Sequence, residues 1–97
     1  MKITLCGRPY DVKLVWLQYS NDNTAIQAVD DEGPVAVLTV NPGFKVPQSH
    51  VVIKDYSENE GALRSLIDAG VIGEPISHIE SGWVTLPVCK ILERKEK

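Results

Sequence analysis

The sequence contains little of what metal-binding or disulfide-stabilised proteins depend on. It has only two cysteines, Cys6 and Cys89, and two histidines, His50 and His78, in 97 residues. Neither histidine has a cysteine, histidine or aspartate partner at metal-ligand spacing, and a small disulfide framework usually needs more cysteines. The pattern predicts no metal site, and it predicts that both cysteines are reduced residues buried on strands.

A charge excess of either sign and a long apolar run are also missing. The net charge is −3, which argues against binding to nucleic-acid phosphates over a basic face. No apolar segment approaches the length that spans a bilayer, and no hydrophobic signal segment follows the N-terminus. Hydrophobic residues at 43% and charged residues at 24% are ordinary globular values. We expect one domain over residues 1–97, located in the cytoplasm.

Sequence motifs of catalysis are absent as well. No glycine-rich phosphate loop lies between a strand and a helix, and no nucleophile elbow is present. A Ser–His–acid triad is recognised by geometry rather than by spacing, so the sequence alone gives no basis for one. We therefore expect a protein that is not an enzyme and that needs no cofactor.

What the sequence does contain is a series of strand patterns and one helix pattern. Short runs of alternating or β-branched apolar residues, separated by Gly, Pro, Asn and Asp, predict six strands. The predicted strands cover residues 2–6, 10–19, 24–29, 35–40, 51–53 and 82–91, the longer connections cover residues 41–49 and 71–81, and a charged tail covers residues 92–97. The predicted fold is α+β, with a mainly antiparallel sheet of five to six strands and one helix packed on one face.

Two of these strands carry positional information. Residues 10–19 have apolar side chains on both faces, which is typical of a central strand and places Trp16 in the core. One face carries Val12, Leu14 and Trp16, and the other carries Val15, Leu17 and Tyr19. In residues 82–91, Pro87 has no N–H to donate, so this strand is predicted to lie at an edge or a bulge there.

The helix is predicted by a start signal, an apolar stripe and a stop signal. Ser57 and Glu60 have the spacing of a capping box, in which each side chain accepts the other residue's backbone N–H. The stripe consists of Leu63, Leu66, Ile67 and Gly70, and Gly70 also suits the residue that ends the helix. Gly61 in the first turn costs about 1 kcal/mol relative to alanine, which a close approach of another backbone, from this chain or a partner, would justify.

The corner between the fifth strand and the helix holds the strongest candidates for a binding site. Lys54, Asp55, Tyr56 and Asn59 are not needed for the capping box, and together they offer a phenol, an amide and both charges. The alternative interpretation is that these residues have only a structural role, which is to end the strand and start the helix. Phe44, in the loop of residues 41–49, is predicted to join the contact surface, because long loops often carry binding residues.

Two further features have both a functional and a structural interpretation. Trp83 follows Ser81 and Gly82 at the start of a strand, where it can be an exposed anchor for a partner or a core residue. The acidic run from Asp30 to Glu32 can bind a cation or a basic partner, or it can be a solvated hairpin tip. No further oxygen ligands are spaced to complete a cation site, which favours the hairpin tip.

The corner also carries a resemblance to a known family. The run from Val52 to Gly61, which contains KDYSENEG, the helix of residues 62–70 and the ending VTLPVC at residues 84–89 resemble a family of small proteins encoded on phages, plasmids and integrative elements of gut-type bacteria. Residues 1–5 and 10–14 are similar to that family too, so the likeness covers most of the chain. The family has no settled activity, and it therefore implies a context rather than functional residues.

The sequence and the resemblance together lead to a functional expectation. Small proteins of mobile elements are often accessory or counter-defence factors, so we expect an inhibitor, similar in action to an anti-CRISPR protein, that binds a host defence protein directly. The expected contact residues are Lys54, Asp55, Tyr56, Asn59, Phe44 and Trp83. One alternative is a protein that sequesters a small nucleotide-type signal, with a dimer or larger oligomer building the pocket. A further alternative is an accessory factor in element transfer or replication.

Overall fold

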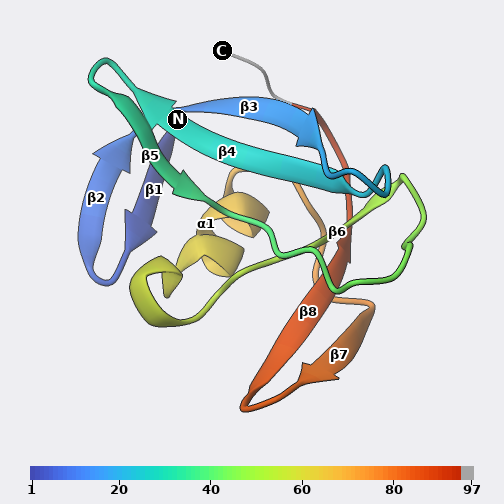
Figure 1. The fold of residues 1–97 in the computed structure, drawn as a ribbon. Coiled ribbons are helices and arrows are strands. Elements are labelled where there is room, and N and C mark those ends of the chain that lie inside the picture. The colour runs from blue at the N-terminus through green and yellow to red at the C-terminus, as the bar shows by residue number, and fades with distance from the viewer. Residues whose placement is uncertain (95–97) are drawn as a thin grey trace.

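The computed structural model describes residues 1–94, and these form eight strands and one α-helix (Figure 1). Every strand pair is antiparallel, which confirms the mainly antiparallel α+β fold. The prediction of one sheet with five or six strands is wrong, because the strands form three small sheets. These are β1 (Lys2–Leu5) with β2 (Arg8–Asp11); β3 (Lys13–Gln18), β4 (Thr24–Asp30) and β5 (Gly33–Val37); and β6 (His50–Val52), β8 (Val84–Lys90) and β7 (Ser77–Ser81), each in that order across the sheet.

The predicted strand of residues 10–19 is divided between two sheets. Its first residues belong to β2, Val12 breaks the strand, and the rest is β3. The N–H of Val12 donates to the carbonyl oxygen of Met1 at 2.7 Å, which ties the break to the start of the chain. The turn before β2 lies at Cys6 and Gly7, whose φ angles are 50° and 78°. Cys6 is therefore exposed in a turn rather than buried on a strand as predicted, whereas Cys89 is buried in β8 and both thiols are free.

The order of strands in the second sheet contradicts the prediction for β3. The central strand is β4, which has β3 on one side and β5 on the other. The apolar residues of β3 do alternate on two faces, but only Leu14 is fully buried, and Leu17 is 48% exposed. The second apolar face of β3 therefore points away from the core. The sequence predicted a central strand because β3 has apolar residues on both faces.

One strand was not predicted at all. β7 lies inside the predicted connection of residues 71–81, and it has a single apolar residue, Ile79, among polar ones. As the outer strand of its sheet it is mostly exposed, so it lacks the alternating pattern that marks a half-buried strand.

Pro87 lies in β8, the middle strand of the third sheet, yet its missing N–H faces no pairing strand. β7 pairs with β8 past this point, with His78 opposite Pro87. On the other side, the β6 ladder ends where Val52 pairs with Val88, and the next residue, Ile53, donates its N–H to the carbonyl oxygen of Pro87. Strand β8 is thus central in the sheet order but has only one pairing strand at the proline, as the missing donor requires.

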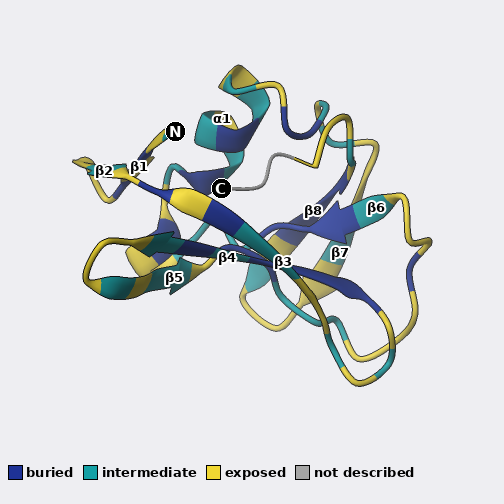
Figure 2. Cartoon of the chain, turned by 90° about the horizontal axis from the view of Figure 1, so that it is seen from above, coloured by how far each residue is buried: buried dark blue, intermediate teal, exposed yellow. Residues whose placement is uncertain are grey.

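The core lies between the sheets and the helix (Figure 2). Its largest fully buried side chains include Ile3 of β1, Ile26 of β4 and Leu66 of the helix, so the first sheet, the second sheet and the helix all contribute. A smaller apolar cluster of Val46, Val52, Leu86 and Val88 lies against the third sheet. No helix within residues 1–94 is long and apolar enough to cross a membrane.

The helix begins later than the sequence predicts. The capping box of Ser57 and Glu60 does not form, because Ser57 starts a short 3-10 turn, η1 (Ser57–Asn59), with a φ of 57°. The α-helix itself is α1 (Ala62–Asp68), whose N-terminal cap residue is Gly61. At the other end Gly70 has a φ of 77°, which confirms its predicted role as the residue that ends the helix.

Candidate functional site

In the corner predicted as a binding site, most of the side chains bond to other groups of the same chain. Asp55 caps α1 from outside the helix, since its Oδ1 accepts the N–H of Gly61 at 3.0 Å and the N–H of Leu63 at 2.9 Å. A carboxylate that accepts the free N–H groups of the first turn stabilises the helix start. This role explains the aspartate at that position. Asp55 thus provides the cap that the sequence analysis assigned to Ser57.

Asn59 has a structural contact as well. Its side chain is only 1% exposed, and its Nδ2 donates to the carbonyl oxygen of Val37 at 2.7 Å. This hydrogen bond connects η1 to the end of β5, and it gives the carbonyl group of Val37 a partner where the strand ends. The described structure therefore places Asn59 beneath the surface that the sequence predicted it to form.

Lys54 and Tyr56 remain at the surface of the corner. The Nζ of Lys54 lies 2.6 Å from Oε2 of Glu58 and 5.6 Å from the centre of the Tyr56 ring. The hydrogen bond from Lys54 lowers the pKa of Glu58 to about 2, and the same bond raises the pKa of Lys54. Lys54 is thus paired with Glu58 and Tyr56 packs against the smaller apolar cluster, so both side chains are held by contacts within the chain.

The loop of Phe44 is ordered by an asparagine that the sequence had not singled out. Asn23 is 2% exposed, its Nδ2 donates to the carbonyl oxygen of Phe44 at 2.8 Å, and its Oδ1 accepts the N–H of Val46 at 2.9 Å. The Phe44 side chain itself is 53% exposed. In Figure 1 this loop, which joins β5 to β6, lies at the opposite side of the molecule from η1. The structure does not bring Phe44 and the corner together.

Trp83 stands apart from the other candidates by its complete exposure. It lies in the turn between β7 and β8, where Ser81 pairs with Val84 and only Gly82 and Trp83 connect the strands. Gly82 has a φ of 59°, a conformation that glycine adopts without strain in such two-residue turns. The Trp83 side chain is 103% exposed, at the tip of a hairpin that projects from the body of the molecule (Figure 1).

The acidic run forms the predicted hairpin tip, whereas Trp16 packs beside the core rather than inside it. Trp16 is half-buried against the core, and the Arg94 guanidinium carbon lies 4.9 Å from its ring centre. The acidic run forms the tip between β4 and β5, where the N–H of Glu32 donates to Oδ1 of Asp30 at 2.8 Å. Within residues 1–94 no group of three or more His, Cys, Asp or Glu residues could hold a metal ion.

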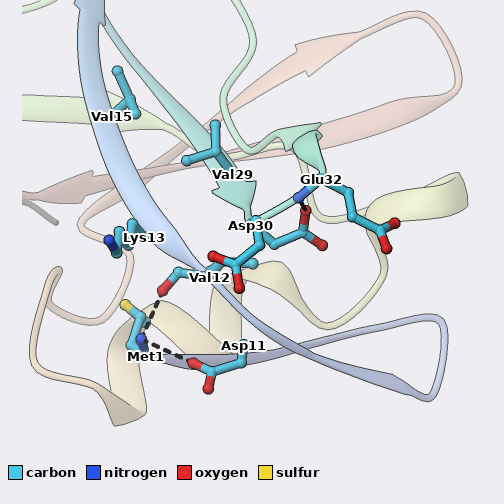
Figure 3. Close-up of a pocket in the computed structure, with 9 residues that line it drawn as sticks. Met1, Asp11, Val12, Lys13, Val15, Val29, Asp30 and Glu32 are labelled. Carbon is cyan, nitrogen blue, oxygen red and sulfur yellow. Dashed lines mark hydrogen bonds and ion pairs between the residues drawn. The ribbon is translucent and has the colours of Figure 1, made fainter.

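A groove at this acidic tip is a feature that sequence reasoning missed. It has a volume of about 840 Å³, and it lies between the β3–β4 sheet and the start of the chain (Figure 3). Val15 and Val29 line it together with the carboxylates of Asp11, Asp30 and Glu32. These residues come from two segments, residues 11–15 and 29–32, and Met1 lines the groove from a third, so only the folded chain shows that they share a site.

Comparisons of the chain with family models, with curated proteins and with solved structures found no match.

Proposed function

We propose that this chain is a non-enzymatic accessory protein of a phage or mobile element, which acts in the cytoplasm by binding and occupying a host defence protein, such as a CRISPR effector. The structural observation that carries the proposal is the complete exposure of Trp83 on a projecting hairpin. The family resemblance of the KDYSENEG segment supplies the biological context.

A tryptophan side chain that stays in water forgoes the free energy that its burial would contribute. An aromatic side chain buries roughly 150–250 Å² when it enters a core or an interface, and each buried Å² contributes about 25 cal/mol. Trp83 gains none of this free energy in the isolated chain, although Val84 beside it is half-buried. Tryptophan is also enriched among the residues that dominate binding free energy in protein interfaces. A two-residue turn has fewer backbone dihedral angles to fix on binding than a long loop, which lowers the entropy cost of inserting the ring into a pocket of a partner.

The geometry favours this function over the sequestration of a nucleotide-type signal. The described groove has an acidic rim, and carboxylates repel the phosphates of such a signal. The same rim and the net charge of −3 also weigh against a role in transfer or replication that depends on binding nucleic acid.

The experiment is an affinity purification from a lysate of bacteria that carry defence systems. The baits are the tagged wild-type chain, Trp83→Ala and the matched control His78→Ala, which changes an exposed residue of the same hairpin. We expect wild type and the control to retain one protein in stoichiometric amount and to inhibit its activity. Trp83→Ala is expected to weaken binding by about thirtyfold or more, because hot-spot residues contribute about 2 kcal/mol or more.

Two results would contradict the proposal. Equal retention of the partner by Trp83→Ala would show that the hairpin tip is not the anchor. A wild-type eluate without any bound protein, or with a bound protein whose activity is unchanged, would contradict inhibition by direct contact.

A further inference from the structure

The sheet of β3, β4 and β5 has an apolar face on its outer side as well as on its inner side. Side chains alternate across a strand, so Leu14 of β3 points into the core, whereas Val15 and Leu17 point outward. Val15 lies opposite Gln27, and Leu17 lies opposite Ala25, which places residues of β4 on the same outer face.

This outer face continues across all three strands. Val29 of β4 lies opposite Lys13, and Val37 of β5 lies opposite Gln27. Leu17 and Val37 are 48% and 44% exposed, respectively, so large apolar side chains on both outer strands contact solvent. An exposed face whose residues would otherwise suit a core is typical of a surface that another chain covers.

The groove continues this face toward the acidic tip. Val15 and Val29 belong to both, and Figure 3 shows them on neighbouring strands beside the acidic side chains. Four carboxylates line the groove, from Asp11, Asp30, Asp31 and Glu32, and they outnumber the two cations there, which are Lys13 and the Met1 amine. The amine is already bound, since it donates to the carbonyl oxygen of Val12 at 2.6 Å and lies 3.5 Å from Asp11.

We propose that the outer face of this sheet and its acidic groove bind an extended segment of a partner protein that carries Lys or Arg beside apolar side chains. The apolar strip matches the alternate apolar residues of such a segment, and the carboxylates match its cations. The volume of about 840 Å³ lies within the range that is typical of ligand pockets. The surface is separate from the Trp83 hairpin in Figure 1, and this proposal does not depend on the function proposed above.

Charge decides between this occupant and a second copy of the chain. A two-fold dimer that seated one groove on the other would place carboxylates against carboxylates, because such an interface uses the same patch on both subunits. A basic segment removes the excess negative charge instead, so the structure favours it.

The test uses the full chain, labelled with ¹⁵N, and two acetylated, amidated hexapeptides. The probe has the sequence KVRLKV, and EVELEV is its charge-reversed control. The variant is Asp31→Lys/Glu32→Lys, and the control variant is Asp68→Lys on the exposed side of α1. Amide shifts from heteronuclear NMR titrations locate each peptide and give its dissociation constant, and sedimentation velocity gives the oligomeric state of each protein.

We expect saturable shifts for KVRLKV at residues 13–17 and 25–32, with binding weakened about tenfold or more by the double variant or by reversal of the peptide charges. The Asp68→Lys protein should bind as wild type does. Absence of saturable shifts, shifts elsewhere on the surface, or equal binding of both peptides would overturn the proposal. A dimer that Leu17→Lys dissociates would overturn it too, because a second copy would then occupy the face.

Discussion

Gly61 lies so close to the backbone of Thr4 that no other residue fits at its position. A Cβ atom on Gly61 would lie 2.5 Å from the carbonyl oxygen of Thr4, and the φ of Gly61 is 103°. Hydrogen bonds surround this contact, since the N–H of Cys6 donates to the carbonyl oxygen of Glu60 at 2.8 Å and the N–H of Thr4 donates to Oγ of Ser65 at 2.9 Å. The predicted close approach at Gly61 is thus confirmed, and the approaching backbone belongs to this chain.

The first prediction is that Gly61→Ala lowers the free energy of unfolding by about 2 kcal/mol or more. The methyl group must push β1 and the helix apart, and a left-handed conformation of a non-glycine residue costs about 1–2 kcal/mol by itself. Gly73→Ala is the matched control, because its new Cβ would meet only side-chain atoms of Leu92 at 3.9 Å or more. Urea denaturation measures both variants, and equal stabilities would contradict the close packing at Gly61.

The second prediction concerns the helix cap. Asp55→Ala should lower the free energy of unfolding by about 1–2 kcal/mol, because two N–H groups of the first turn lose their acceptor. Asp55→Asn keeps a side-chain oxygen and should cost less. Ser57→Ala should have a small effect, since the Ser57 side chain makes no capping bond in the structure. A larger loss of stability for Ser57→Ala than for Asp55→Ala would restore the capping box of the sequence prediction.

The third prediction concerns the dependence of the Lys54–Glu58 pair on pH. The hydrogen bond from Lys54 favours the ionised form of Glu58 and lowers its pKa from 4.5 to about 2 in the folded chain. The unfolded chain therefore binds more protons between these values, so the contribution of the pair is present above pH 4.5 and is lost as the pH falls toward 2.

An NMR titration of the Glu58 carboxyl group measures this shift directly. Lys54→Met should raise the Glu58 pKa toward 4.5. The control Arg64→Met should leave the pKa near 2, because Arg64 pairs with Asp68 and Glu74 instead. A wild-type Glu58 pKa close to 4.5 would show that the pair does not persist in solution.

The fourth prediction distinguishes the two thiols. Burial raises the pKa of Cys89 to about 11, so its reactive thiolate is scarce at pH 8, whereas Cys6 is exposed. Iodoacetamide should alkylate Cys6 alone in the native protein and both cysteines in urea, which intact-mass spectrometry measures. Rapid native modification of the Cys6→Ser variant would contradict the burial of Cys89.

The sequence predicted elements whose signals are local. The stop at Gly70 is one, since the N–H of Gly70 donates to the carbonyl oxygen of Ile67 and that of Val71 to Leu66, as in a Schellman motif. Trp83 is an intermediate case, because the sequence left open whether it is exposed or in the core, and its position in the two-residue turn leaves it fully exposed. Such features depend on adjacent residues alone, and the sequence contains those.

Features that depend on distant contacts were missed or misassigned. Asp55 became the helix cap because η1 turns the chain so that Gly61 and Leu63 face its carboxylate. Asn59 fitted a polar contact surface by type, and only the position of Val37 shows that its amide is used internally. The apolar residues on the outer face of β3 led the sequence to predict a central strand, but β3 is an outer strand of its sheet and Leu17 is 48% exposed.

The central claim is that Trp83 enters a partner protein, and a photo-crosslinking residue at position 83 tests it most directly. The chain with p-benzoylphenylalanine at position 83 is produced in bacteria that carry defence systems, irradiated, and purified through a tag under denaturing conditions. It is compared with the same substitution at Asp68, an exposed residue of α1. We predict one discrete covalent adduct of a defence protein from position 83 and none from position 68. The same adducts from both positions, or no adduct from position 83, would contradict the claim.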